Sequence, residues 1–161
     1  MAVRGTAGAR DSCGEFTEVR SLEGFVWDWG GLNWFAIIVA MGSLLVLSSV
    51  WYLKPLTGKW WMADLGLTDE KMQANSSWAI FVWPIVTGLV SAVAIALLME
   101  NIGGGAAEGL LIGALTGVGI AAMAEVPHFI FSLQPIRLMF INTGQTAVTL
   151  SVMGLIIGAW G

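Results

Sequence analysis

The chain has 161 residues, of which 57% are hydrophobic and only 11% are charged. Soluble domains carry about 25% charged residues, so this composition excludes an ordinary soluble fold and indicates a membrane protein. Eleven acidic and seven basic side chains give a net charge of −4, which is the wrong sign for binding nucleic acid. The single cysteine, Cys13, can form neither an internal disulfide nor a cysteine-based metal site.

Residues 1–31 form a tail that lacks the apolar core of a secretory signal peptide, so we expect no cleavage there. Apolar residues recur in this tail at spacings of three and four, which is typical of an amphipathic helix. Docking of that helix on the membrane surface or on a partner, and packing on this protein's own loops, both stay open. The apolar positions are Phe16, Val19, Leu22, Val26 and Trp29.

Four apolar stretches follow the tail, and each is long enough to cross a hydrocarbon layer of roughly 30 Å as a helix. We therefore expect an all-α fold, an integral membrane bundle of four transmembrane helices with an N-terminal amphipathic interfacial tail. Residues 32–161 form the membrane domain, and we end its third span near Ala124 because Pro127 favours a helix end. The predicted spans are residues 32–53, 78–99, 106–124 and 138–160.

Tryptophan and tyrosine near the ends of these stretches indicate interfacial anchors, because their amphipathic rings suit the headgroup layer. Basic residues near the spans resist translocation, and most of them fall in the first and third connections. We therefore expect both termini on the non-cytoplasmic side of an energy-transducing or bacterial inner membrane. The expected anchors are Trp34, Trp51, Tyr52, Trp60, Trp61 and Trp160, and the basic residues are Lys54, Lys59, Lys71 and Arg137.

Small residues recur every four positions along the third span and form a groove that lets another helix approach closely. We favour span two as the covering helix, because Gly103-Gly104-Gly105 makes the connection between the two spans short. Packing within the bundle and a seam for another subunit both stay open. The predicted packing residues are Gly105, Gly109, Gly113 and Gly117 on the third span, Gly154 and Gly158 on the fourth, and Asn142, which can bond across helices.

Three ionisable residues, Glu108, Glu125 and His128, lie within or beside the third apolar stretch, and such residues are functional candidates by default. Glu125 and His128, three apart on a helix, could share a proton or hold a metal, but two ligands seldom make a metal site. Water or headgroups at the interface would also satisfy them. We therefore assign no catalytic residue and no metal. No cofactor is required, and contact with a lipid or with a pigment bound through His128 stays open.

Motifs at both ends of the membrane domain form a combination found in one family. The first span opens with Leu32-Asn33-Trp34, and the first connection contains Gly58-Lys59-Trp60-Trp61. The fourth span begins with Pro135-Ile136-Arg137-Leu138 and closes with Gly158-Ala159-Trp160. Over roughly residues 31–161 the chain resembles the small membrane proteins called domain of unknown function seventeen-sixty-one. The resemblance implies a four-span fold without an assigned activity.

The sequence contains no nucleophile elbow, phosphate loop, HExxH helix or dinucleotide fingerprint, which disfavours an enzyme. We expect an accessory or scaffold subunit that packs against the lipid bilayer and other transmembrane subunits, in a respiratory or photosynthetic complex. The alternative is a small transporter or channel-like carrier that uses intramembrane glutamates. A polar path to the middle of the membrane would favour the carrier, whereas outward-facing seams of small or aromatic residues would favour the scaffold.

Overall fold

The computed structural model describes residues 29–74 and 77–160, so the predicted amphipathic helix of the tail lies outside the described residues except for its last position, Trp29. Four helices in the described part are long and apolar enough to cross a membrane. This result confirms the predicted all-α fold with four spans. The spans are α1 (Trp34–Trp51), α4 (Ala79–Ile102), a composite third helix, and α7 (Ile136–Trp160).

The third helix consists of three consecutive segments, α5 (Ala106–Ala114), the π-helical segment η2 (Leu115–Ala122) and α6 (Met123–Phe131). It therefore continues beyond Ala124, where we expected it to end. Pro127 lies inside α6. A proline is tolerated within a transmembrane helix because neighbouring helices and local π adjustments satisfy the backbone groups that it frees.

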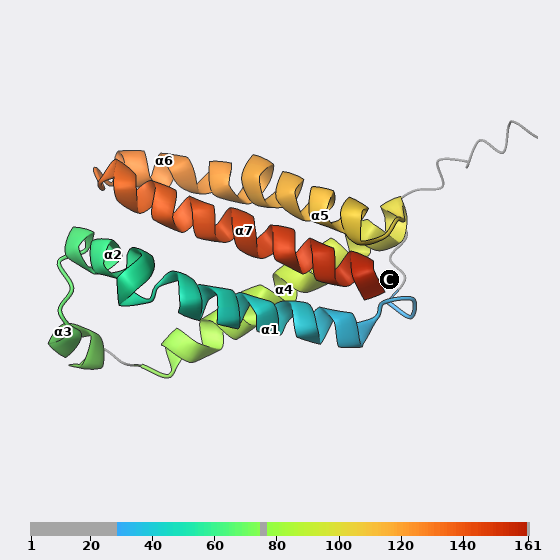
Figure 1. Ribbon diagram of the computed structural model, residues 1–161, viewed down its shortest axis with the longest axis horizontal. Coiled ribbons are helices and arrows are strands. Elements are labelled where there is room, and N and C mark those ends of the chain that lie inside the picture. The colour runs from blue at the N-terminus through green and yellow to red at the C-terminus, as the bar shows by residue number, and fades with distance from the viewer. Residues whose placement is uncertain (1–28, 75–76, 161) are drawn as a thin grey trace, which may run out of the picture.

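The first connection contains η1 (Lys54–Gly58), α2 (Lys59–Asp64) and α3 (Asp69–Ala74), and α2 and α3 lie at the end of the molecule opposite the C-terminus (Figure 1). Arg137, at the start of α7, donates from Nε to Asp64 Oδ2 at 2.9 Å and forms an ion pair with the same carboxylate. This hydrogen bonding holds the pKa of the Asp64 carboxyl below its ordinary value. The ion pair thereby ties the first connection to the fourth span.

Helix α7 is the central element, because it contacts α1, α4 and every segment of the third helix. Helices α1 and α4 also pack on one another, and the core lies where these two meet α7 (Figure 1). Fully buried side chains there include Ile37 and Ala40 from α1, Ala92 from α4 and Met153 from α7. Around the bundle the spans follow the order α4, α1, α7, third helix, so that α4 and the third helix are also neighbours.

The small-residue groove of the third helix is covered by α7. A Cβ atom added at Gly109 would lie 3.0 Å from the carbonyl carbon of Gly154 and 3.1 Å from the Cα atom of Gly158. A Cβ atom at Gly113 would lie 2.9 Å from the Cα atom of Ser151. These partners are backbone atoms, which cannot rotate away, so the close approach depends on glycine at both positions. The expectation that span two covers the groove is therefore wrong.

Span two is engaged elsewhere, because Gly88, one of its small residues, faces α1. A Cβ atom at Gly88 would meet the Leu44 and Met41 side chains at 3.4 Å, and Ala92 is fully buried in the core. The short Gly103-Gly104 reversal, where both residues have positive φ, brings α5 back beside the end of α4 only. A short connection therefore placed the two helices next to each other without making either the principal partner of the other.

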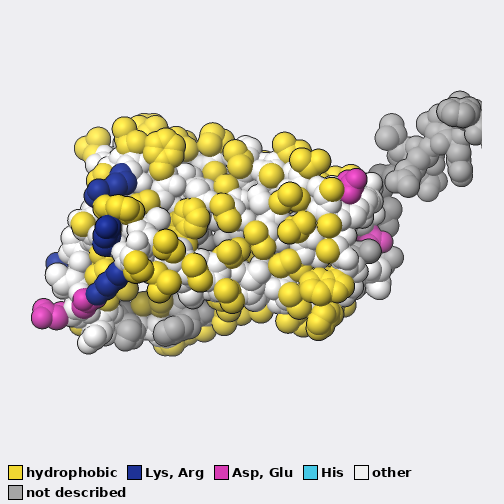
Figure 2. All heavy atoms as spheres, in the orientation of Figure 1, with side chains coloured by type: hydrophobic (Ala, Val, Ile, Leu, Met, Phe, Trp, Pro, Cys, Tyr) yellow, Lys and Arg dark blue, Asp and Glu magenta, His cyan; other side chains and the backbone are white. Residues whose placement is uncertain are grey.

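The outer surface between the two ends of the molecule is largely apolar. Large hydrophobic side chains are exposed along all four spans, and Figure 2 shows them covering the face in view. Lys and Arg side chains on this face gather at one end of the molecule (Figure 2). An apolar belt bounded by charged ends matches the surface that a lipid bilayer requires.

Candidate functional site

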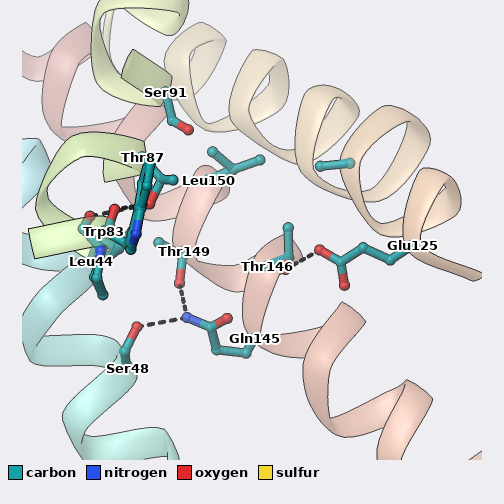
Figure 3. Close-up of a pocket in the computed structure, with 12 residues that line it drawn as sticks. Leu44, Ser48, Trp83, Thr87, Ser91, Glu125, Gln145, Thr146, Thr149 and Leu150 are labelled. Carbon is teal, nitrogen blue, oxygen red and sulfur yellow. Dashed lines mark hydrogen bonds between the residues drawn. The ribbon is translucent and has the colours of Figure 1, made fainter. Parts of the chain in front are cut away.

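A cavity of about 460 Å³ lies between α4 and the third helix, with α1 and α7 at its base (Figure 3). On the α4 wall Trp83 and Thr87 are exposed, so the cavity opens sideways onto the apolar belt. We call it the lateral pocket. It is lined by Leu44 and Ser48 of α1, Trp83, Pro84, Thr87 and Ser91 of α4, Ala121 of η2, Glu125 of α6, and Gln145, Thr146, Thr149 and Leu150 of α7.

The base of the lateral pocket is a small polar network between α1 and α7. The Gln145 amide donates from Nε2 to Ser48 Oγ at 2.7 Å and to Thr149 Oγ1 at 3.3 Å (Figure 3). Thr149 is only 3% exposed and lies near the middle of α7. Polar atoms therefore extend from the pocket wall to about half the depth of the fourth span, in a region that is otherwise apolar.

Glu125 supplies the one charged side chain among the described residues that line the lateral pocket. Its carboxylate accepts a hydrogen bond at Oε1 from Thr146 Oγ1 at 2.9 Å, and Figure 3 shows it directed from α6 toward α7. Phe131, where the third helix ends, is six residues further on, so Glu125 lies about 9 Å from that end along the helix axis. None of the twelve described residues that line the pocket is Lys, Arg or His. The pocket is therefore electrically negative whenever Glu125 is ionised.

The π-helical segment explains why Glu125 faces α7. An α-helix has 3.6 residues per turn, so residues four apart drift steadily around its axis. A π-helix closes its hydrogen bonds five residues back and therefore holds more residues per turn, which reverses this drift. Gly113, Gly117, Ala121 and Glu125 are spaced by four across η2. The segment thus keeps this row on one side of the third helix, and the glycine seam leads directly to the carboxylate.

A second polar contact lies beside the pocket, at the end of α1. Tyr52 donates its hydroxyl proton to Asn142 Oδ1 at 2.8 Å. Partial burial, with a smaller contribution from the Glu125 carboxylate, raises the pKa of Tyr52 to about 12. The phenol is therefore neutral at physiological pH and remains a hydrogen-bond donor that links α1 to α7. Asn142, proposed from the sequence as a residue that bonds across helices, takes part in this contact.

A groove extends from the lateral pocket toward the other end of the molecule. It runs between α4 and the third helix and has a volume of about 230 Å³. Ser91, Ala121 and Leu150 line both the groove and the pocket, so the two spaces adjoin. The remaining lining residues are almost all apolar: Ala94, Ile95, Leu98, Thr116 and Ile120. Together they form a sideways opening along one flank of the bundle.

The other ionisable candidates lie outside the lateral pocket. Glu108 is at the opposite end of the third helix, where its Oε2 accepts a hydrogen bond from the Gly105 amide at 2.9 Å and caps α5. His128 is exposed, and its ring packs edge-on against Phe129 with centroids 5.8 Å apart. The described residues contain no group of three or more His, Cys, Asp or Glu that could hold a metal ion.

The aromatic residues proposed as anchors fall into two groups. Trp34, Trp60 and Trp160 are exposed, as an interfacial side chain requires, whereas Trp51, Tyr52 and Trp61 are partly buried. Trp51 donates from Nε1 to the Ile141 carbonyl at 3.1 Å. The partly buried side chains therefore join α1 to other elements of the protein.

Sequence reasoning did not identify most of the pocket residues. Ser48, Thr87, Ser91 and Thr149 are isolated hydroxyl residues in apolar stretches, and each resembles an ordinary helix residue that bonds its own backbone. The one available signal was Gln145 with Thr149, which places an amide and a hydroxyl on one face of the fourth span.

Comparison with known proteins identifies the family of the chain but assigns no activity to it. Residues 35–158 match the model of a family described as "Protein of unknown function (DUF1761)". No curated protein and no solved structure matches the chain significantly.

Proposed function

Since the chain belongs to the DUF1761 family, whose description assigns no activity, we propose a function from the lateral pocket: the protein is a small membrane carrier that binds an amphipathic molecule taken from the lipid. The observation that carries this proposal is a pocket in the membrane-spanning region with polar atoms at its base and an opening onto the apolar belt. Glu125, Gln145 and Thr149 supply the polar atoms.

The size and composition of the pocket support binding of a small molecule. Ligand pockets are typically clefts of about 300–1,000 Å³, lined mainly by apolar side chains with a few polar groups that fix the ligand's orientation. The lateral pocket has about 460 Å³ and meets this description, with Leu44, Trp83 and Leu150 among its apolar walls. Its polar path reaches the middle of α7, which is the feature that we set out as favouring a carrier.

The glycine groove gives no support to an accessory or scaffold subunit, because it is covered by α7 of the same chain. One observation still favours that role as a second candidate. Gly119 is exposed on the third helix, and no heavy atom lies within 4 Å of a Cβ position there, so a helix of another subunit could approach closely. Co-purification in mild detergent of a partner that is lost on Gly119→Trp would establish this second function.

Blocking the lateral pocket tests the carrier proposal. The full chain is placed in nanodiscs of neutral phospholipid and titrated with 1-aminoanthracene, a small fluorescent amphiphile that is uncharged at pH 7, and binding to empty nanodiscs is subtracted. Ala121→Trp places an indole against the pocket and should weaken binding by at least about tenfold, which corresponds to about 1.4 kcal/mol. Gly119→Trp, in the same π-helical segment but with open space around it, is the matched control and should leave binding unchanged. Equal binding by all three proteins would refute the proposal.

A further inference from the structure

The charges around the lateral pocket restrict what can enter it. Among the described residues that line it, Glu125 is the only charged one, and its carboxylate receives one neutral hydrogen bond, from Thr146. Charged groups within a membrane pair with one another or with polar backbone, because an isolated charge is costly in a medium of low dielectric constant. A positively charged ligand would pair with the Glu125 carboxylate, whereas an anion would be repelled by it.

None of the four Lys and Arg residues in the described part of the chain lines the lateral pocket. Lys54 bonds Asp69 at 2.7 Å, and Arg137 is paired with Asp64, both in the first connection or at its contact with α7. Lys59 lies over the ring of Trp60, 4.5 Å from its centroid. These cations are therefore held at the end of the molecule, and none of them lines the pocket.

The rest of the lining favours an organic cation over a bare metal ion. Metal ions such as Ca²⁺ and Mg²⁺ require several oxygen ligands, commonly carboxylates, and Glu125 is the only carboxylate among the described residues that line the pocket. Opposite it are an indole, Trp83, and the aliphatic side chains of Leu44 and Leu150. An aromatic face attracts an ammonium group, and aliphatic walls accommodate apolar substituents.

The position of the opening agrees with the same class of ligand. The groove between α4 and the third helix is almost entirely apolar and adjoins the pocket at Ser91 and Ala121. An ammonium ion with apolar substituents concentrates in the lipid near the headgroups. It could therefore reach Glu125 sideways from the bilayer without crossing the charged end of the protein.

We propose that the lateral pocket binds a small organic cation, an ammonium group with apolar substituents, with Glu125 as its counter-charge and Trp83 as its aromatic wall. This inference rests on the proposed function, since it names the ligand class of the same pocket. Glu125 contacts the ligand directly, and Thr146 is a positioning residue that orients the carboxylate through its hydrogen bond.

Two probes of the same shape separate the effect of charge from that of size. Trimethylphenylammonium and tert-butylbenzene differ in having a positive nitrogen or a neutral carbon at one position. Each competes with 1-aminoanthracene for the full chain in neutral nanodiscs, with concentrations in the bilayer determined on empty nanodiscs. We expect the cation to bind at least about tenfold more tightly than the isostere at equal membrane concentration. Glu125→Gln should reduce this ratio to within about twofold, whereas His128→Ala, on the same helix but outside the pocket, should preserve it.

The outcomes distinguish this inference from the proposed function. Equal displacement by both probes in the unaltered protein, with 1-aminoanthracene binding still weakened by Ala121→Trp, would support the pocket and overturn the inference that it binds a cation. Failure of 1-aminoanthracene to bind above empty nanodiscs would overturn both. The charge preference of the unaltered protein is measured without any variant, so it decides the inference even if Glu125→Gln fails to fold. Loss of preference on Thr146→Val, with binding of tert-butylbenzene intact, would confirm the positioning role.

Discussion

The backbone contact between α5 and α7 makes a quantitative prediction for Gly113→Ala. The new Cβ atom would lie 2.9 Å from Ser151 Cα, which falls 0.5 Å short of the 3.4 Å at which ordinary van der Waals contact begins. The nearby Leu150 carbonyl carbon, at 3.0 Å, blocks the same space. The two helices must therefore move apart, which loses contacts along the seam that continues through Gly109 and Gly154. Overpacking of this kind typically costs about 1–3 kcal/mol.

The matched control is Gly42→Ala, because Gly42 also lies in a transmembrane helix but has no heavy atom within 4 Å of a Cβ position. Alanine in a helix is favoured over glycine by roughly 0.5–1 kcal/mol, and this gain applies to both variants. We therefore expect Gly113→Ala to lose roughly 0–2.5 kcal/mol of unfolding free energy, centred near about 1 kcal/mol, and Gly42→Ala to gain about 0.5–1 kcal/mol. Unfolding in mixed micelles of mild detergent and dodecyl sulfate measures both. Equal stability of the two variants would show that α5 and α7 are not in backbone contact.

Three further predictions concern the connections and the end of α1. Arg137 lowers the pKa of Asp64 in the folded state, so this ion pair stabilises the fold above the ordinary carboxyl pKa of about 4, and the stabilisation is lost as the pH falls below that value. Asp64→Asn should therefore flatten the acid side of a plot of melting temperature against pH. An unchanged plot would exclude the ion pair. Tyr52→Phe removes the donor to Asn142 and should cost about 0.6–1.7 kcal/mol in the same micelle assay, with no loss contradicting an interhelical role. In a cysteine-free background, Lys59→Cys should be labelled only from the cytoplasmic side and a cysteine at the C-terminus only from the other side. Labelling of both from the same side would contradict the four-span fold.

The four spans could be predicted from the sequence because the bilayer requires a similar length and hydropathy of every helix that crosses it. Which helices pack together could not be predicted from the sequence, because packing depends on the complete surface of each helix. Small residues occur on spans two, three and four, so composition alone allowed α4 or α7 to cover the third helix. The choice follows from geometry: Gly154 and Gly158 allow backbone contact with Gly109, whereas Gly88 receives the side chains of Leu44 and Met41.

The third helix shows a second limit of sequence reasoning. Pro127 predicts a helix end in water, where a freed carbonyl can bond to solvent. Prolines are tolerated within membrane helices, and here the helix continues through Pro127 to Phe131. The π-helical segment directs Glu125 toward α7 and thus determines the chemistry of the pocket. Thr146, which bonds that carboxylate from 21 positions away in sequence, has no local pattern that would reveal the contact.

The two sides of the lateral opening differ in how firmly they are held, and this difference predicts which side moves. The third helix meets α7 through backbone atoms, whereas the atoms nearest a Cβ position at Gly88 of α4 belong to the side chains of Leu44 and Met41 in α1, and α4 joins α5 through Gly103 and Gly104. Movement of α4 about that connection is therefore the less costly way to close the groove. A disulfide between Ser91→Cys and Ala121→Cys, which line the groove from opposite walls, requires Cβ atoms about 3.5–4.5 Å apart and so reports closure. In a chain without Cys13, we expect this disulfide to form in the empty protein and to form severalfold more slowly when 1-aminoanthracene occupies the pocket. A rate that does not depend on the probe would mean that α4 and the third helix keep a fixed separation, and a carrier with this fold would then need a different moving element.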